Sequence, residues 1–262
     1  MEINMPETAD LNAVCSQLLH PDDLQISSEL YNQILNDEIV SKIFVKDNNV
    51  SIKIYSTKPL HLSSMTPVLH DFGFLIIDEI TYELSKESGS IHINRFNIDI
   101  QDLKTFTLAK DNIEKIISLS LLGKSFDKCR LYSLVYLENF SLRHIMLMRS
   151  IIDYLGQAVL TLNTGAIIQT LNHHHGITKL FVEYFLTKFD PTLKQRESKL
   201  KAICAEIDES IKTVPNILED KILKLTYTLL QSLLRTNYFL EQEGIALKIH
   251  TELFAEHLKG IQ

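Results

Sequence analysis

The strongest pattern of apolar positions lies near the C-terminal end, over residues 217–239. Read as a helix, this segment carries two apolar faces and one consistent polar strip, Lys221, Lys224, Thr228, Gln231 and Arg235. The apolar faces are Leu218, Ile222, Leu225, Leu229 and Leu233 on one side, and Leu223, Tyr227, Leu230 and Leu234 on the other. A helix that is apolar on two sides must be covered on both. The pattern therefore predicts a central helix rather than a surface helix.

Residues 48–100 show the two-residue alternation that is typical of half-buried strands. Val50, Ile52 and Ile54, for example, alternate with polar neighbours. The predicted elements are a strand around residues 50–55, a helix over 62–72 that Gly73 ends, and strands over 74–84 and 90–100 joined by a hairpin at 86–89.

This order of strand, helix, strand and strand predicts the first part of a ferredoxin-like βαββαβ unit. The apolar parity of its last strand changes between Ile93 and Phe96, which predicts a β-bulge near Asn94 and Arg95. A sheet of three strands also has unpaired edges. We therefore expect the unit to pair edge to edge with another copy or with a similar unit.

The remaining segments have mainly helical spacing. In the lead-in, the stretches 10–19 and 27–44 predict helices, with Pro21 between them as a breaker. Ile245–His250 predicts a strand that begins a further region. The predicted fold class is thus α+β, a small ferredoxin-like βαββ unit followed by a mainly α-helical domain. The predicted segments are a helical lead-in at 1–45, the βαββ unit at 46–105, a helical domain at 106–243 and the start of a following region at 244–262.

Charge and composition exclude several classes of protein. A net charge of −7 and a pI near 5.8 argue against nucleic-acid binding, which requires clustered Lys and Arg. The chain has no uncharged stretch of about 18 apolar residues, so no membrane span is expected. Its acidic N-terminus lacks the pattern of a signal peptide. The three cysteines, Cys15, Cys129 and Cys204, form no Cys-x-x-Cys pair and indicate reduced thiols in the cytoplasm.

The glycines exclude a nucleotide-binding loop. A dinucleotide fold and a P-loop both need closely spaced glycines, so that the backbone can approach phosphate. The chain has 8 glycines, and no two are closer than Gly156 and Gly165. The sequence therefore predicts no NAD site and no catalytic residue within these 262 residues.

We interpret the runs of polar residues as structural features rather than as functional sites. His173, His174 and His175 are consecutive and would point in three directions on a helix, so a turn is favoured over a metal site. Adjacent carboxylates, Asp78–Glu79 and Glu219–Asp220, indicate solvated or capping roles. Cys129 and Cys204 have no local signature of a nucleophile and are expected to be buried. Two interpretations of Arg235, Thr236 and Asn237 stay open: a joint at the end of the central helix, or a contact with a following catalytic region.

Two sequence segments resemble segments of the large, roughly 180 kDa class of NAD-dependent glutamate dehydrogenases. Leu62–Glu79 is similar to their last ACT-like unit, and Leu234–Phe239 to the segment before their catalytic region. The resemblance runs from about residue 25 to 250 and includes the middle stretch 127–157 and the pair of segments at 180–183 and 188–191.

The resemblance implies a non-catalytic regulatory and structural segment of an enzyme that oxidises L-glutamate to 2-oxoglutarate with NAD⁺. It also implies an amino-acid effector, an oligomer formed through the parent enzyme, and an interdomain contact at Arg235, Thr236 and Asn237. The candidate regulatory turn is Thr57, Lys58, Pro59 and Leu60, where ligand-binding ACT domains usually have Gly at the position of Leu60. Residues 244–262 resemble the start of a region that the sequence does not complete, which favours a truncated product. The alternative is a self-standing ACT-like amino-acid-sensing or scaffold protein.

Overall fold

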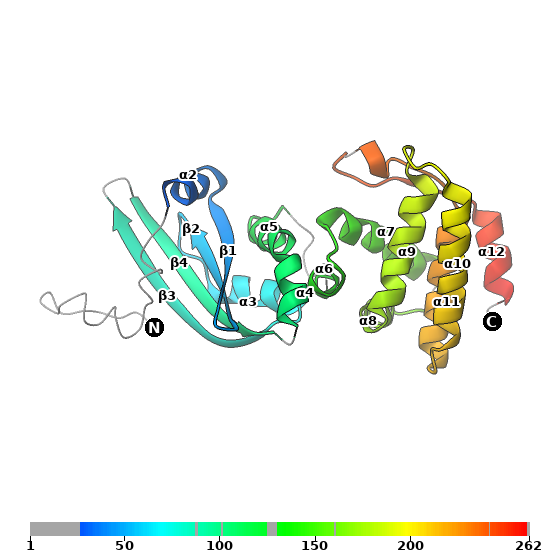
Figure 1. The fold of residues 1–262 in the computed structure, drawn as a ribbon, viewed down its shortest axis with the longest axis horizontal. Coiled ribbons are helices and arrows are strands. Elements are labelled where there is room, and N and C mark those ends of the chain that lie inside the picture. The colour runs from blue at the N-terminus through cyan, green and yellow to red at the C-terminus, as the bar shows by residue number, and fades with distance from the viewer. Residues whose placement is uncertain are drawn as a thin grey trace, which may run out of the picture. The chain divides into compact units, whose positions relative to one another are not determined.

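The computed structural model describes residues 27–86, 89–100, 102–124, 130–159, 161–240 and 242–260. The chain divides into two compact units, Met1–Cys129 and Arg130–Gln262 (Figure 1). The predicted helix over 10–19 lies outside the described residues, as do Cys15 and Cys129. Within the described part, no helix is both long enough and apolar enough to cross a membrane.

The first unit is a four-stranded antiparallel sheet with helices on both faces. Its strands are ordered β1-β2-β4-β3. The elements are α2 (Ser28–Asp37), β1 (Ile39–Lys46), β2 (Asn49–Ser56), α3 (Leu62–Asp71), β3 (Leu75–Lys86), β4 (Gly89–Asp99), α4 (Leu103–Leu108) and α5 (Lys110–Leu121).

The prediction of a helix through residue 44 is wrong at its C-terminal half, because Ile39–Lys46 is strand β1. Asp47 and Asn48 have positive φ angles of 48° and 66° and form a two-residue turn between Lys46 and Asn49. Asp and Asn adopt this conformation readily, and such turns match the twist of paired strands. Strand β1 thereby occupies the sheet edge beside β2, the position of the fourth strand in a βαββαβ unit.

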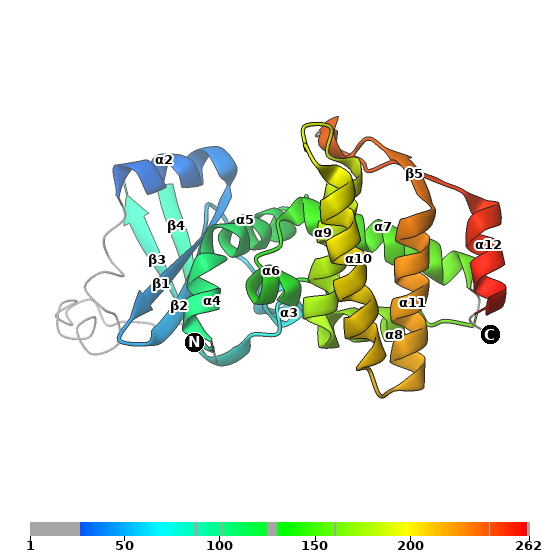
Figure 2. The same cartoon turned by 45° about the vertical axis from the view of Figure 1, so that its right-hand side comes forward.

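The two faces of the sheet are covered by different helices. Ile34 of α2 packs with Val40, Tyr55, Ile91 and Ile93 on one face. On the opposite face, the hydroxyl of Ser41 donates to the carbonyl of Glu114 in α5. Figure 2 shows α2 at one end of the sheet, apart from α4 and α5.

This arrangement explains the apolar parity of β4, and the predicted bulge near Asn94 and Arg95 is wrong. Both residues pair in register with β2, and β4 is continuous there. Ile93 lies on the face of the sheet that α2 covers, and Phe96 lies on the face that α5 covers. The change of apolar parity therefore marks a change in which face is buried, and the strand itself stays regular. The irregularity of the sheet lies in β3, between Ile76 and Asp78.

The second unit is a helical bundle around α11. Its elements are α6 (Ser133–Glu138), α7 (Leu142–Ala158), α8 (Thr164–His173), α9 (His175–Phe189), α10 (Arg196–Lys212), α11 (Ile217–Ser232), β5 (Leu233–Thr236), η2 (Tyr238–Leu240), β6 (Leu247–Ile249) and α12 (Thr251–Gly260). In Figures 1 and 2, α9, α10 and α11 lie side by side.

The prediction of a central helix is confirmed for its position and, from Ile222 onward, for its two covered faces, whereas Leu218 in the first turn is 50% exposed. Helix α11 contacts α7, α8, α9, α10 and α12. Leu225 on one face and Tyr227 on the other are both buried. Its predicted end is wrong, because α11 stops at Ser232 and the chain continues as strand β5. Leu234 is consequently exposed rather than part of the second apolar face.

Candidate functional site

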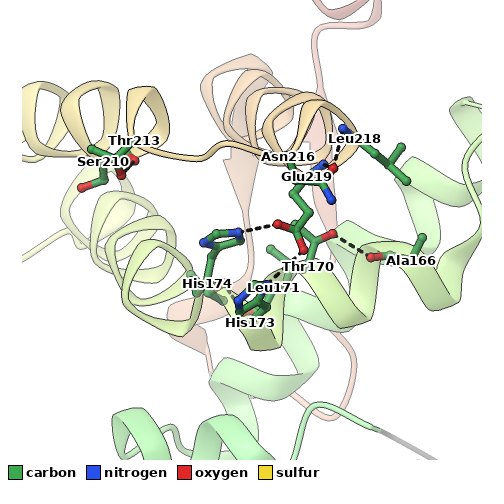
Figure 3. A network of polar contacts seen from close by, with 11 residues as sticks. Ala166, Thr170, Leu171, His173, His174, Ser210, Thr213, Asn216, Leu218 and Glu219 are labelled. Carbon is green, nitrogen blue, oxygen red and sulfur yellow. Dashed lines mark hydrogen bonds and ion pairs between the residues drawn. The ribbon is translucent and has the colours of Figure 1, made fainter.

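Two of the three consecutive histidines converge on one carboxylate. The Nδ1 atom of His173 lies 3.0 Å from Oε1 of Glu219, and Nε2 of His174 lies 3.0 Å from Oε2. Figure 3 shows both imidazoles facing the carboxylate of Glu219. His175 points elsewhere, and its Nδ1 lies 2.5 Å from Oε1 of Glu138.

The end of one helix and the start of the next bring these two histidines together. Helix α8 ends at His173 and α9 begins at His175, while His174 has φ −100° and ψ 50° and belongs to neither helix. Residues in a continuous helix are rotated by about 100° from one to the next, but the break removes that divergence here. The imidazole rings of His173 and His174 are 4.6 Å apart with 31° between their planes.

Glu219 is held in the first turn of α11. The side chain of Asn216 caps this helix by accepting from the N–H groups of Leu218 and Glu219 at 2.9 and 3.2 Å. Hydrogen bonds from His173, and then from His174, hold the pKa of the Glu219 carboxyl below its ordinary value. The adjacent Asp220 turns away and pairs with Lys224 at 2.7 Å.

The cluster lies beside an open hollow. His173 is 66% exposed, whereas the side chains of His174 and Glu219 are each 17% exposed. The hollow is lined by the histidine run, by Glu209 and Ser210 of α10, and by Thr213 just after that helix. One ligand-type atom from each of His173, His174 and Glu219 lies within 4.8 Å of the other two. Two imidazoles and a carboxylate at this spacing can hold a metal ion or share protons.

The turn Thr57, Lys58, Pro59 and Leu60 is closed by its neighbours in the first unit. The N–H of Thr57 donates to the carbonyl of Glu38 at 3.2 Å. The hydroxyl of Ser56 donates to the carbonyl of Lys58 at 2.7 Å. Lys58 and Pro59 are exposed and Leu60 is half-buried. The side chain of Lys58 is thus accessible to a ligand.

One of the two interpretations assumed that Asn237 ends a helix, and this is not what the structure shows. Asn237 instead organises the loop between β5 and β6. Its Nδ2 donates to Oε1 of Gln242 and to the carbonyl of Gly244, both at 3.0 Å, and its Oδ1 accepts from the N–H of Ala246 at 2.7 Å. Arg235 is exposed, and the hydroxyl of Thr236 accepts from the N–H of Tyr238.

The pattern along the chain did not indicate a role for Arg143. From α7, its guanidinium donates to the carbonyls of Tyr238 and Gln242 and lies 4.8 Å from the centre of the Tyr238 ring. This contact spans 95 residues, so only the tertiary fold reveals it. Asn237 and Arg143 therefore fix the β5–β6 loop together.

The other candidate residues have structural contacts. Asp78 accepts from Asn97 at 2.8 Å, and Glu79 accepts from the hydroxyl of Thr81 at 2.6 Å. Cys204 is a free thiol that is half-buried, so the prediction that it is buried is wrong. Burial first, and then a hydrogen bond with Cys204, raise the pKa of Tyr227.

Family models match most of the described part of the first unit and the first half of the second. Residues 37–110 match the ACT3 domain of glutamate dehydrogenase, and residues 128–191 match its helical motif 3. These matches bear out the resemblance and the α+β fold class that the sequence predicted.

The curated relatives include three NAD-specific glutamate dehydrogenases. The Pseudomonas aeruginosa protein is 29% identical over 211 residues, the Halomonas elongata protein 25% over 203, and the Mycobacterium tuberculosis protein 24% over 212. The alignments cover 74%, 75% and 74% of this chain, but 12%, 12% and 13% of the relatives. The chain carries the ACT3 domain and helical motif 3 of the large NAD-specific glutamate dehydrogenases and belongs with that family.

Proposed function

We propose that this chain is a non-catalytic regulatory and structural segment of an NAD-dependent glutamate dehydrogenase. The parent reaction converts L-glutamate, NAD⁺ and water to 2-oxoglutarate, ammonium and NADH. The carrying observation is the adjacency of two units that match an ACT3 domain and helical motif 3 in one chain. The wide spacing of the 8 glycines supports the same proposal, because no segment has the pattern of a dinucleotide-binding turn.

In this proposal the first unit is the regulatory part. Its effector is an amino acid that contacts the turn Thr57–Leu60, where the exposed ammonium of Lys58 can pair with a carboxylate. The second unit is the connector to the catalytic region in the cytoplasm, and Arg235, Thr236 and Asn237 contact that region. Exposure of Arg235 at the end of β5 supports such a contact.

Two measurements on the purified chain test the proposal. Calorimetry with NAD⁺ and an absorbance assay with L-glutamate should detect neither binding nor turnover. Micromolar binding of NAD⁺, or NADH production, would overturn the non-catalytic assignment.

The regulatory assignment is tested by thermal unfolding with each of the standard amino acids in turn. At least one should raise the melting temperature of the wild-type chain, and Lys58→Ala should abolish that rise. Lys104→Ala, an exposed lysine on α4, serves as the matched control and should keep it. The absence of any shift would contradict the effector role.

A further inference from the structure

We propose that His173, His174 and Glu219 form a binding site for a divalent transition-metal ion, with Zn²⁺ as the expected occupant. The proposal concerns the second unit and does not depend on the parent reaction. One ligand-type atom from each of the three residues lies within 4.8 Å of the other two, and Figure 3 shows the three side chains gathered at the start of α11.

The spacing of the atoms fits such an ion. Zn²⁺ binds imidazole nitrogen and carboxylate oxygen at about 2.0–2.2 Å, so neighbouring ligand atoms in a tetrahedral site lie about 3.3 Å apart. Nδ1 of His173 and Nε2 of His174 each lie 3.0 Å from the Glu219 carboxylate, the first from Oε1 and the second from Oε2, and one ligand-type atom from each residue lies within 4.8 Å of the other two. Rotation of the exposed His173 ring can shorten the longer separations, since this ring is the least buried of the three groups.

The proton balance of the site also permits a metal. Without an ion, the hydrogen bonds place a proton on Nδ1 of His173 and on Nε2 of His174, facing Glu219. On binding, each imidazole moves its proton to its other ring nitrogen and offers the freed lone pair to the ion. The carboxylate of Glu219 then binds the ion directly instead of accepting those two hydrogen bonds.

Charges around the site oppose one another: a helix dipole disfavours a cation, whereas two carboxylates attract one. The N-terminal end of α11 is the positive end of a helix dipole, which disfavours a cation nearby. The carboxylate of Glu219 places a negative charge on that first turn, directly against the two imidazoles. Glu209 adds a second carboxylate on the wall of the hollow, although Lys212 pairs with it at 2.6 Å.

The donor set selects the class of metal. Imidazole nitrogen suits Zn²⁺ and its first-row neighbours, whereas Mg²⁺ and Ca²⁺ prefer oxygen donors alone. Three protein ligands leave a fourth position, which water from the open hollow can fill. The ion would join the α8–α9 junction to the first turn of α11, and its binding would stabilise the helical unit.

Co²⁺ and Zn²⁺, added to the purified full chain after removal of metal with a chelator, test this site. Co²⁺ should give the visible absorption of a low-coordinate nitrogen and oxygen site, and Zn²⁺ should displace it and raise the melting temperature. His174→Ala and Glu219→Gln should each weaken Co²⁺ binding by at least about tenfold. Glu219→Gln keeps an oxygen that can accept from one histidine, so this variant is expected to fold.

His175→Ala is the matched control, because it removes the neighbouring histidine that contacts Glu138 instead. It should leave the Co²⁺ spectrum and affinity unchanged, with circular dichroism confirming that all variants are folded. Equal affinity in the wild type, His174→Ala and Glu219→Gln would overturn the proposal. So would the absence of binding at about 1 mM metal, a concentration that corresponds to a binding free energy of only about −4 kcal/mol.

Discussion

The carboxylate of Glu114 on α5 accepts a hydrogen bond from the backbone N–H of Ile43 in strand β1, at 2.7 Å. The other carboxylate oxygen of Glu114 pairs with Nζ of Lys42 at 3.1 Å. One helical turn further on, the hydroxyl of Ser118 accepts from the N–H of Ser41 at 2.8 Å. A helix therefore satisfies two N–H groups on the side of β1 that faces away from β2, and it covers this part of the sheet edge.

Loss of the buried carboxylate should destabilise the first unit. Glu114→Ala leaves the N–H of Ile43 without its acceptor, and a buried unsatisfied donor costs about 1–3 kcal/mol. Urea melts followed by circular dichroism measure the change. Lys115→Ala, the exposed neighbour on the same helix, is the control and should change the free energy of unfolding by less than about 0.5 kcal/mol. Equal effects of the two substitutions would show that Glu114 does not support β1.

Strand β3 is the other edge of this sheet, and we expect the unit to pair through it. Leu75 and Ile77 on β3 are 67% and 65% exposed, at a bulge between Ile76 and Asp78. A charged residue on an edge strand opposes strand pairing, so Ile77→Lys should shift the purified chain from dimer to monomer in light scattering. Leu108→Lys, at a 71% exposed position on α4, should leave the dimer intact. A wild-type chain that stays monomeric at every concentration would contradict this prediction.

The elements with a long, regular hydrophobic period were predicted correctly from the sequence. The predictions failed where local turn signals or tertiary packing favour a different structure from the hydrophobic period. Residues 39–46 fit a helical spacing, but the Asp47–Asn48 pair after them is a hairpin signal and decides for a strand. The end of α11 was missed for a different reason. Leu233 and Leu234 continue the apolar run into β5, where pairing with β6 replaces helical hydrogen bonds.

The histidine run shows why a site is harder to predict than a fold. Consecutive residues diverge on a helix, and that argument holds for His175, which contacts Glu138. It fails for His173 and His174, because the chain breaks between α8 and α9 at this position. Their shared partner, Glu219, lies 45 residues beyond His174. Only the packing of α11 against the α8–α9 junction reveals the cluster.

Both faces of α11 should be sensitive to truncation of their side chains. Leu225 is 1% exposed, and Tyr227 is 7% exposed with its ring 5.5 Å from Tyr184 and 6.1 Å from Phe181. Leu225→Ala and Tyr227→Ala should each cost about 2–5 kcal/mol in denaturant melts. Lys224→Ala, which removes an exposed ion pair with Asp220, should cost less than about 1 kcal/mol. If Tyr227→Ala resembled Lys224→Ala, the second face would not be a closed core.

The β5–β6 loop should open when Asn237 loses its amide. Asn237→Asp replaces an N–H donor by an oxygen that faces two acceptors, Oε1 of Gln242 and the carbonyl of Gly244. We expect faster hydrogen exchange and faster proteolysis over residues 238–246, with a loss of stability of about 1 kcal/mol. Arg235→Ala, at an exposed neighbouring position, should leave both rates near those of the wild type. Unchanged exchange in Asn237→Asp would mean that Arg143 alone fixes the loop.

Lys188 makes the stability of the second unit vary with pH in the alkaline range. Its Nζ donates to the carbonyls of Leu230 and Gln231, at 3.1 and 2.7 Å, near the end of α11. Burial lowers the pKa of Lys188 from 10.5 to about 8, and this outweighs the opposing electrostatic effect of Cys204.

The sign of the effect follows from the protons bound by each state. Below a pH of about 8, Lys188 is charged in both the folded and the unfolded chain, and its contribution to stability is constant. Between about 8 and 10.5, the folded chain has released this proton and the unfolded chain still holds it. Stability rises with pH wherever the unfolded state binds more protons.

The wild type should therefore gain stability across this window relative to Lys188→Met, which cannot titrate. Urea melts of both chains at several pH values measure the difference, in which all other titrating groups cancel. A difference that stays flat from pH 8 to 10.5 would show that the amine of Lys188 keeps its ordinary pKa and is not desolvated in the folded chain.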